Sequence, residues 1–163
     1  MGRLESFIRR LVAQRDCLDA AGHLVERVPG VVLELGLGNG RTCDHLRTLL
    51  PDREIFVFDR RIAAHPDCVP DEDHMIVGDV RVTLTEAGDE LAGEVALVHA
   101  DLGSGQPDID HELSRTIAPL LVDLVCPGGV IVSDQSLPLD DWQEVDLPPD
   151  VPAGRYYMYR APE

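Results

Sequence analysis

The sequence predicts an α/β fold: a single doubly wound, mostly parallel sheet with helices at its N-terminus and an antiparallel hairpin at its C-terminus. Short apolar runs rich in valine and isoleucine alternate with segments of helical periodicity, and such runs are typical of strands buried on both faces. The 163 residues contain no repeat, no low-complexity tract and no interdomain linker. We therefore expect one domain over residues 1–163, with a helical segment at 1–29 and an α/β core at 30–163.

The N-terminal segment has the period of an amphipathic helix. Apolar residues recur at three- and four-residue steps from Leu4 to Val28, which is the spacing of one helix face. Gly22 is expected to divide this segment into two helices, and Pro29 with Gly30 ends it.

Strands and helices then alternate. The strands are predicted at 31–35, 54–58, 74–77, 95–99 and 130–133, and the helices at 41–50, 81–91 and 109–125. Pro119 falls inside the last helix and predicts a break or kink there. Pro66 and Pro70 limit the segment between the second and third strands to one helical turn at most.

The last elements are expected to be two short strands. Residues 142–147 and 155–160 flank a turn rich in proline and predict an antiparallel hairpin. The link to this hairpin from the preceding strand is shorter than the dozen residues of a usual crossover, so the sequence leaves the edge of the sheet undetermined.

The charge excludes some partners. Thirty acidic and 14 basic residues give a net charge of −16, a field that repels phosphate backbones and anionic lipid, so we expect no nucleic acid and no membrane partner. All the basic residues are arginine, which excludes lysine chemistry. Arg3, Arg9, Arg10 and Arg15 gather near the N-terminus, either as a solvated helix face or as a patch for an acidic substrate or partner.

The cysteines and the N-terminus indicate the compartment. Cys17, Cys43, Cys68 and Cys126 form no close pair, which suits reduced thiols rather than a zinc or redox site. The first residues lack the apolar core of a signal peptide, and a cytoplasmic protein is expected.

The stretch "LELGLGNGRT" follows the first strand and places glycine at 36, 38 and 40. In a doubly wound sheet this first turn borders the ligand site, and glycine lets a ligand approach the backbone. The dinucleotide fingerprint G-x-G-x-x-G would need its third glycine at Arg41, where a long side chain stands.

Acidic residues end the next two strands. Asp59 can accept hydrogen bonds from both hydroxyls of a ribose, a device that several cofactors share. Arg60 follows it and could contact a 2′-phosphate, which keeps NADP as an alternative cofactor. Asp79 ends the third strand and could also serve as the N-cap of the next helix.

The spacing E-x-G-x-G-x-G from Glu34 resembles the first motif of class I S-adenosylmethionine-dependent methyltransferases. The resemblance implies S-adenosyl-L-methionine as the cofactor, bound by the turn residues and by the acids that follow. It places Glu34 near the positive groups of the cofactor, Asp79 at the adenine amino group and the N–H of Val80 at a ring nitrogen. The residues implied in cofactor binding are Glu34, Gly36, Gly38, Asn39, Gly40, Asp59, Arg60, Asp79, Val80 and Asp101.

A narrower resemblance covers nearly the whole chain after Val31. The segments "FVFDR", "HPDCVPDEDH", "LVHADLGSG" and "GGVIVSDQ" are similar to a small bacterial family of S-adenosylmethionine methyltransferases whose substrate is not established. This implies an enzyme with a Rossmann-like methyltransferase fold. An NAD(P)-dependent oxidoreductase and a non-catalytic module that binds S-adenosylmethionine are the alternatives.

Catalytic residues are expected after the fourth and fifth strands, where Asp101, Asp134 and Gln135 lie. Asp101 could bind the methionine ammonium or act on the substrate. The three also resemble the Asp and Asp-Asn set that holds Mg²⁺ in catechol-type O-methyltransferases, which makes a metal site a speculative alternative to a site without metal. His99 is better explained as a hydrogen-bonded core residue than as a base.

The acceptor is predicted to be a small molecule. No insertion is large enough for a separate substrate domain, so the acceptor would bind under the N-terminal helices or across the interface of a homo-oligomer. Aromatic residues that could line its pocket are Phe7, Trp142, Tyr156, Tyr157 and Tyr159.

Overall fold

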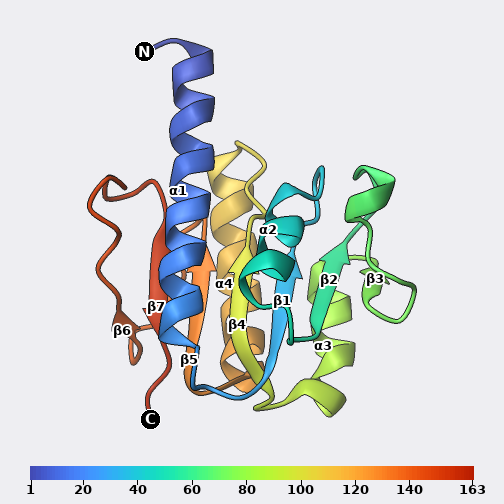
Figure 1. The fold of residues 1–163 in the computed structure, drawn as a ribbon. Coiled ribbons are helices and arrows are strands. Elements are labelled where there is room, and N and C mark those ends of the chain that lie inside the picture. The colour runs from blue at the N-terminus through green and yellow to red at the C-terminus, as the bar shows by residue number, and fades with distance from the viewer.

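The computed structural model describes residues 1–163 and contains one seven-stranded sheet in the order β3-β2-β1-β4-β5-β7-β6 (Figure 1). The strands are β1 (Val31–Leu35), β2 (Ile55–Asp59), β3 (Met75–Val77), β4 (Val95–Ala100), β5 (Val125–Ser133), β6 (Gln143–Glu144) and β7 (Tyr157–Arg160). The first five strands pair in parallel, whereas β7 runs antiparallel to β5 and β6 antiparallel to β7. The predicted fold class is therefore confirmed, including its C-terminal hairpin.

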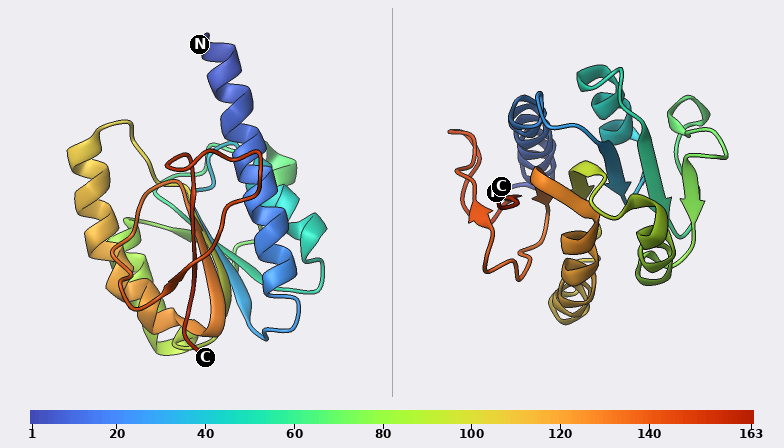
Figure 2. Two further views of the ribbon diagram at one scale, coloured as in Figure 1. Left: turned by 90° about the vertical axis from the view of Figure 1, so that its left-hand side faces the viewer. Right: turned by 90° about the horizontal axis from the view of Figure 1, so that it is seen from below.

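Helices cover both faces of the sheet. They are α1 (Arg3–Leu24), α2 (Arg41–Leu49), α3 (Val80–Leu91) and α4 (Pro107–Leu124), with one 3₁₀ turn, η1 (Pro66–Cys68). α1 and α2 lie on one face and α3 and α4 on the other (Figure 2). None of these helices combines the length and the apolar character needed to cross a bilayer.

Each face of the sheet carries its own hydrophobic core, because alternate residues of a strand point to opposite sides. In β1, Val32 packs with the residues of α1 and α2, and its neighbour Leu33 packs with those of α3 and α4. The same alternation places Leu97 of β4 in the first core and Val98 in the second. These two cores fix the strands, and the carboxyl ends of the parallel strands β1 to β5 form one edge beneath the first turns of α1 (Figure 1).

The N-terminal segment forms one helix, and the expected division at Gly22 is wrong. α1 runs unbroken to Leu24, and its buried residues Cys17, Leu18 and Ala21 continue the contact with the sheet. A single glycine inside a helix costs about 1 kcal/mol relative to alanine, which is less than this buried face supplies.

The proline in the last helix also leaves it uninterrupted. α4 is continuous through Pro119, whose ring lies on the exposed side of the helix. Arg115, whose carbonyl would have accepted from the missing N–H, is also exposed, so this interruption of the helix hydrogen bonds lies on the solvent side.

The fifth strand begins earlier than predicted. Pro127, Gly128 and Gly129 indicate a turn in the sequence, yet β5 starts at Val125, directly after α4. Val125 pairs with Val95 of β4, and the register then shifts before Leu97, so the strand absorbs these residues in an irregularity. Gly128 has a φ of +74°, a conformation that favours glycine. The single turn expected near Pro66 is confirmed as η1.

Candidate functional site

The edge where β1 and β4 end is the topological switch point of the sheet. The chain leaves β1 toward β2 on one side, and β4 continues to β5 on the other. The two strands stay in register to their ends, where Leu35 pairs with Ala100. The backbone N–H of Asp101 then donates to the carbonyl of Leu35 at 3.0 Å. Ligands of doubly wound sheets bind at such a point.

The glycine turn after β1 is shaped both by packing and by an open side. Gly36 has a φ of +91°, and a Cβ there would collide with the carbonyl oxygen of Asp101. Gly38 has a φ of +53°, and a Cβ there would meet nothing within 4 Å. The backbone of Gly38 therefore faces free space that a side chain would fill, which suits the close approach of a ligand.

A cleft of about 250 Å³ lies above this turn. One wall comes from α1, the other from the glycine turn and the first turn of α2, and Asp101 closes its base. The cleft is lined by Phe7, Arg10, Leu11, Gln14, Gly36, Leu37, Gly38, Asn39, Arg41, Thr42 and Asp101. Helix, turn and strand end thus converge on one cavity at the predicted edge.

Asp59 ties the end of β2 to the glycine turn. Its Oδ2 accepts hydrogen bonds from the backbone N–H groups of Leu37 at 2.9 Å and Gly38 at 3.3 Å. Its Oδ1 accepts from the N–H of Arg60 at 2.7 Å. Carboxylate oxygens have further acceptor capacity, so the predicted contact of Asp59 with ribose hydroxyls stays compatible with this geometry.

Asp79 is both a helix cap and an ion-pair partner. As the N-cap of α3, it accepts from the N–H of Arg81 at 3.0 Å, which is the alternative role expected from the sequence. The Arg81 side chain also donates to both carboxylate oxygens. These contacts, with Arg60 at 3.7 Å, hold the pKa of Asp79 well below its ordinary value. Val80 follows as the first residue of α3.

Glu34 lies beneath the turn, inside the core on the α1 side of the sheet. Its side chain is fully buried, and its Oε1 lies 2.6 Å from Nδ1 of His99, whose Nε2 lies 2.8 Å from the hydroxyl of Tyr156. Burial raises the pKa of Glu34. Burial opposes protonation of His99, but the carboxylate of Glu34 outweighs it and raises the pKa of His99. The core role expected for His99 is confirmed.

The second oxygen of Glu34 has no hydrogen-bond partner although it is buried. Such an oxygen is costly to leave unpaired, and it belongs to the first residue of the glycine motif. Glu34 is not among the residues that line the cleft described above. The predicted contact between Glu34 and the cofactor remains a prediction.

Asp101 is held by two side chains of α1. Arg10 Nη2 donates to its Oδ1 at 2.8 Å, and Gln14 Nε2 donates to its Oδ2 at 2.8 Å. Arg10 and Gln14 are one helical turn apart, so they reach the carboxylate from the same face of the helix. From the sequence, Arg10 was considered only as part of an arginine patch near the N-terminus, and Gln14 was not singled out.

Asp134 and Gln135 lie below the loop that follows β4 rather than in the cleft. The carboxylate of Asp134 accepts from the N–H groups of Leu102 at 3.3 Å and Gly103 at 3.0 Å. Gln135 Nε2 donates to the same carboxylate at 3.3 Å. Burial, followed by repulsion from Asp101, raises the pKa of Asp134 to about 6. Among the three residues predicted to be catalytic, Asp101 alone lines the cleft.

The carboxylates of the speculative metal set carry other contacts in this arrangement, and the metal alternative stays a prediction. Both oxygens of Asp101 are engaged by α1, and both oxygens of Asp134 are engaged by backbone or amide N–H groups. No three His, Cys, Asp or Glu side chains in the chain lie close enough to hold an ion together.

The aromatic residues divide between core and cleft. Phe7 lines the cleft, where the guanidinium of Arg41 lies 5.8 Å from the centre of its ring. Tyr156 is buried against His99, and the hydroxyl of Tyr159 accepts from the N–H of Leu137. Of the five aromatic residues considered for the substrate pocket, only Phe7 therefore contributes to this cleft.

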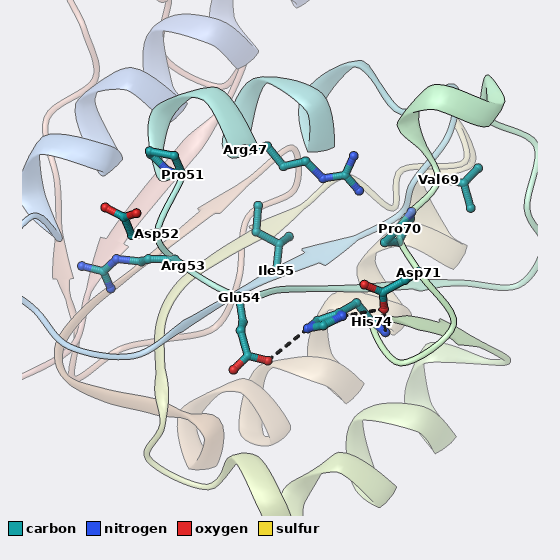
Figure 3. A pocket seen from close by; sticks show the side chains of 10 residues that line it. All are labelled: Arg47, Pro51, Asp52, Arg53, Glu54, Ile55, Val69, Pro70, Asp71 and His74. Atoms are coloured by element: carbon teal, nitrogen blue, oxygen red, sulfur yellow. Dashed lines mark hydrogen bonds and ion pairs between the residues drawn. The ribbon is translucent and has the colours of Figure 1, made fainter.

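A larger hollow, of about 500 Å³, lies elsewhere on the molecule (Figure 3). It surrounds the start of β2, where His74 bridges Asp71 at 2.6 Å and Glu54 at 3.0 Å. This is the amino end of the strand, opposite the edge at which parallel sheets bind ligands. Because this hollow lies away from the carboxyl ends of the strands, the cleft above the glycine turn is the better candidate site.

Comparison with known proteins agrees with this geometry. Residues 1–161 match a protein family described as S-adenosyl-L-methionine methyltransferase. The S-adenosyl-L-methionine methyl transferase from Silicibacter pomeroyi DSS-3 is 41% identical, covers 98% of both chains and superposes with a TM-score of 0.92. No protein of curated function matches the sequence.

More distant structures share the fold. The antibiotic-resistance methyltransferase Kmr is 18% identical, with 82% of this chain and 87% of that chain covered and a TM-score of 0.53. The 16S rRNA (adenine(1408)-N(1))-methyltransferase from Catenulisporales acidiphilia, a W203A mutant with cosubstrate SAM, is 13% identical over 90% and 91% of the two chains, with a TM-score of 0.52. The chain belongs to the S-adenosyl-L-methionine methyltransferase family, and it is an enzyme that uses this cofactor rather than an NAD(P)-dependent oxidoreductase.

Proposed function

We propose that this methyltransferase acts on a small-molecule acceptor that binds in the cleft between α1 and the glycine turn. The observation that carries the proposal is the position of α1, whose Phe7 and Leu11 form an apolar wall directly over the turn. A cleft of about 250 Å³ is at the scale of small-ligand sites. The segment after β2, which contains η1, is too short to form a separate substrate domain.

The charge of the chain favours such an acceptor over RNA. One structural neighbour is a 16S rRNA methyltransferase, but this chain carries a net charge of −16. Proteins that bind nucleic acid neutralise phosphates with basic residues. A strongly acidic surface repels that backbone and leaves small acceptors as the favoured class.

We place each part of the cofactor beside the strand ends whose residues would contact it. On the β2 and β3 side, Asp59 would accept from the ribose hydroxyls, Asp79 from the adenine amino group, and the N–H of Val80 would face a ring nitrogen. Gly38 and Asn39, exposed at the mouth of the turn, would lie beside the methionine end.

S-adenosyl-L-methionine supplies a methyl group on a positively charged sulfur, which leaves as a neutral thioether when an acceptor attacks in line. The protein then has to align the acceptor and exclude water. Asp101 lies at the base of the cleft and is our candidate for contact with the ammonium group or the acceptor. Asp134 and Gln135 support it by fixing the loop at Leu102 and Gly103.

The helical segment and the α/β core act as one unit in this proposal. α1 packs on the sheet through Cys17, Leu18 and Ala21, and its earlier turns form a wall of the cleft. Residues 1–163 would therefore be required together for methyl transfer, as a single catalytic domain.

The cofactor assignment is tested by calorimetry with S-adenosylmethionine and S-adenosylhomocysteine. We expect binding by the wild type and its loss in Asp59→Ala, because this variant removes the acceptor for the ribose and for the amides of Leu37 and Gly38. Asp52→Ala is the matched control, an exposed acid in the loop before β2. Equal binding by both variants would show that Asp59 has no part in the site.

The acceptor class is tested by turnover. The enzyme is incubated with labelled S-adenosylmethionine and either a library of small hydroxyl, amine and thiol compounds or purified ribosomal RNA. Methyl incorporation into a library compound, with saturation, supports the proposal. Incorporation into RNA with none into the library would show that the acceptor class is wrong.

A further inference from the structure

The cleft contains a pair of opposite charges that no sequence motif predicts. Arg10 of α1 and Asp101 after β4 are 91 positions apart, and their side chains meet at 2.8 Å. Asp101 is 18% exposed and Arg10 is 47% exposed, so the pair can be reached from the cleft. Gln14, which is buried, holds the other oxygen of Asp101.

The methionine end of the cofactor carries the same two charges. An ammonium and a carboxylate are attached to one carbon, so a site for this end needs an anion and a cation within a few ångströms of each other. The cleft offers this combination in Asp101 and Arg10, next to the open backbone at Gly38.

We propose that Arg10 binds the α-carboxylate of S-adenosylmethionine. In the free protein Arg10 and Asp101 neutralise each other; when the cofactor binds, its ammonium takes the place of the guanidinium at Asp101, and the guanidinium turns to the carboxylate. Every charge keeps a partner in this exchange, which avoids the cost of burying an unpaired ion. Because a partly exposed ion pair contributes little to stability, separating it costs little.

The other arginines near the cleft are less well placed to bind the cofactor carboxylate. Arg9 bonds to Glu5 and Arg15 bonds to Asp16 along the surface of α1, and neither lines the cleft. Arg41 does line it, but from the opposite wall, where its guanidinium lies over the ring of Phe7. Arg10 alone among the cleft arginines forms an ion pair with Asp101.

A guanidinium also suits this ligand by its chemistry. It stays charged at any working pH and can bind a carboxylate through two parallel N–H groups. Placed on α1, it would make cofactor binding pull the helix toward the turn. The acceptor wall formed by Phe7 and Leu11 belongs to the same helix face, so the carboxylate contact would also fix that wall.

The experiment compares ligands that differ only at the carboxylate. Calorimetry is performed on the wild type and Arg10→Gln with S-adenosylmethionine and with its decarboxylated form. We expect the wild type to prefer S-adenosylmethionine by about ten- to hundredfold, the range of a charge-assisted hydrogen bond. Arg10→Gln should lose that preference while its affinity for the decarboxylated ligand stays within about twofold.

Two further variants make the result specific. Arg9→Gln removes a neighbouring arginine outside the cleft and should bind both ligands as the wild type does. Arg41→Gln tests the opposite wall. If Arg41→Gln and not Arg10→Gln abolishes the preference, the carboxylate site lies on α2 and the proposal is overturned.

The wild type alone also gives a decisive measurement. Equal affinity for the two ligands would mean that no residue recognises the carboxylate, which overturns the proposal even if Arg10→Gln folds poorly. Arg10→Lys keeps the charge and should retain part of the preference. The proposal depends on the cofactor and not on the acceptor: a wild type that binds the cofactor but methylates no library compound would contradict the proposed function alone.

Discussion

On the two sides of the glycine turn, the surroundings shift the pKa of an acidic residue in opposite directions. On the β2 and β3 side, Asp79 is paired with the guanidinium of Arg81, and its pKa lies well below the ordinary value. On the β4 and β5 side, Asp134 is largely buried near Asp101, and its pKa is raised to about 6. One side holds a carboxylate that stays charged, and the other holds one that can take up a proton near neutral pH.

This difference suits two kinds of ligand contact. Hydroxyl and amino groups of an adenosine need hydrogen-bond acceptors, and Asp79, whose pKa is lowered, would provide one that keeps its charge. Chemistry on an acceptor benefits from a group whose pKa lies near the working pH. Asp134 has that property, so proton transfer is expected on the β4 and β5 side, which also holds the proposed contacts with the methionine end, and recognition of the adenosine part is expected on the other side.

The largest effect is expected where the two sides touch, at Gly36. An added Cβ would collide with the carbonyl of Asp101, at a φ of +91° that side chains rarely adopt. We expect Gly36→Ala to lower the free energy of unfolding by about 2–4 kcal/mol and to abolish cofactor binding. Chemical denaturation and calorimetry measure the two effects.

Gly38→Ala is the matched control for this prediction. Its Cβ would meet nothing within 4 Å, so only the left-handed backbone opposes it, at a cost of about 1 kcal/mol. The added methyl group would still enter the cleft and weaken cofactor binding. Equal stability of the Gly36→Ala and Gly38→Ala variants would show that the two sides do not share a tightly packed wall.

The fold could be predicted where local patterns decide. The apolar run of β1 and the glycines after it gave the strand, the turn and the start of α2 at 41. The same reasoning failed where distant contacts overrule a local signal. Pro127 and Gly128 indicate a turn, but pairing of Val125 with Val95 draws them into β5, and no local spacing encodes that partner.

The residues of the site could likewise be predicted only where a local pattern decides. Asp59 follows from its place at a strand end beside the turn, since adjacent parallel strands end together. Arg10 and Gln14 could not be placed, because their partner Asp101 lies 87 to 91 positions away. One signal was available: Gln14 is a polar residue on the apolar face of α1 that includes Leu11 and Leu18, and a buried polar group requires a partner.

A smaller effect is expected on the β4 and β5 side, where the free energy of unfolding should depend on the protonation of Asp134. The raised pKa of Asp134 means that the folded chain binds a proton that the unfolded chain releases. Its contribution to stability is therefore complete below about pH 4, the ordinary value for aspartate, and is lost as the pH rises through about 6. Between these values the free energy of unfolding of the wild type should fall relative to Asp134→Asn, by about 2 kcal/mol.

Denaturation at several pH values between 4 and 7 measures this difference. Asp140→Asn, an exposed aspartate in the loop after β5, serves as the control and should follow the wild type at every pH. A constant difference between the wild type and Asp134→Asn across this range would mean that the hydrogen bonds from Leu102 and Gly103 keep the carboxylate ionised in spite of its burial.

The smallest effect is expected on the solvated side, at Arg81. Its side chain is 49% exposed, and exposed ion pairs contribute little at neutral pH, so the unfolding temperature of Arg81→Gln at pH 7 should fall only slightly below that of the wild type. The pKa of Asp79 should rise toward its ordinary value, because Arg81 is the main cause of its depression. Titration of the Asp79 carboxyl carbon by NMR measures this shift.

The lowered pKa of Asp79 also determines how the stability of the folded chain changes in acid. A carboxyl whose pKa is lowered by folding stabilises the folded chain above its unfolded pKa, and this contribution is lost as the pH falls. Arg81→Gln should therefore lose less stability than the wild type below pH 4. Arg115→Gln, an exposed arginine on α4, is the control and should leave Asp79 unchanged. A large drop in unfolding temperature at pH 7 would instead make the Asp79–Arg81 pair structural, and the contrast between the two sides of the turn would not hold.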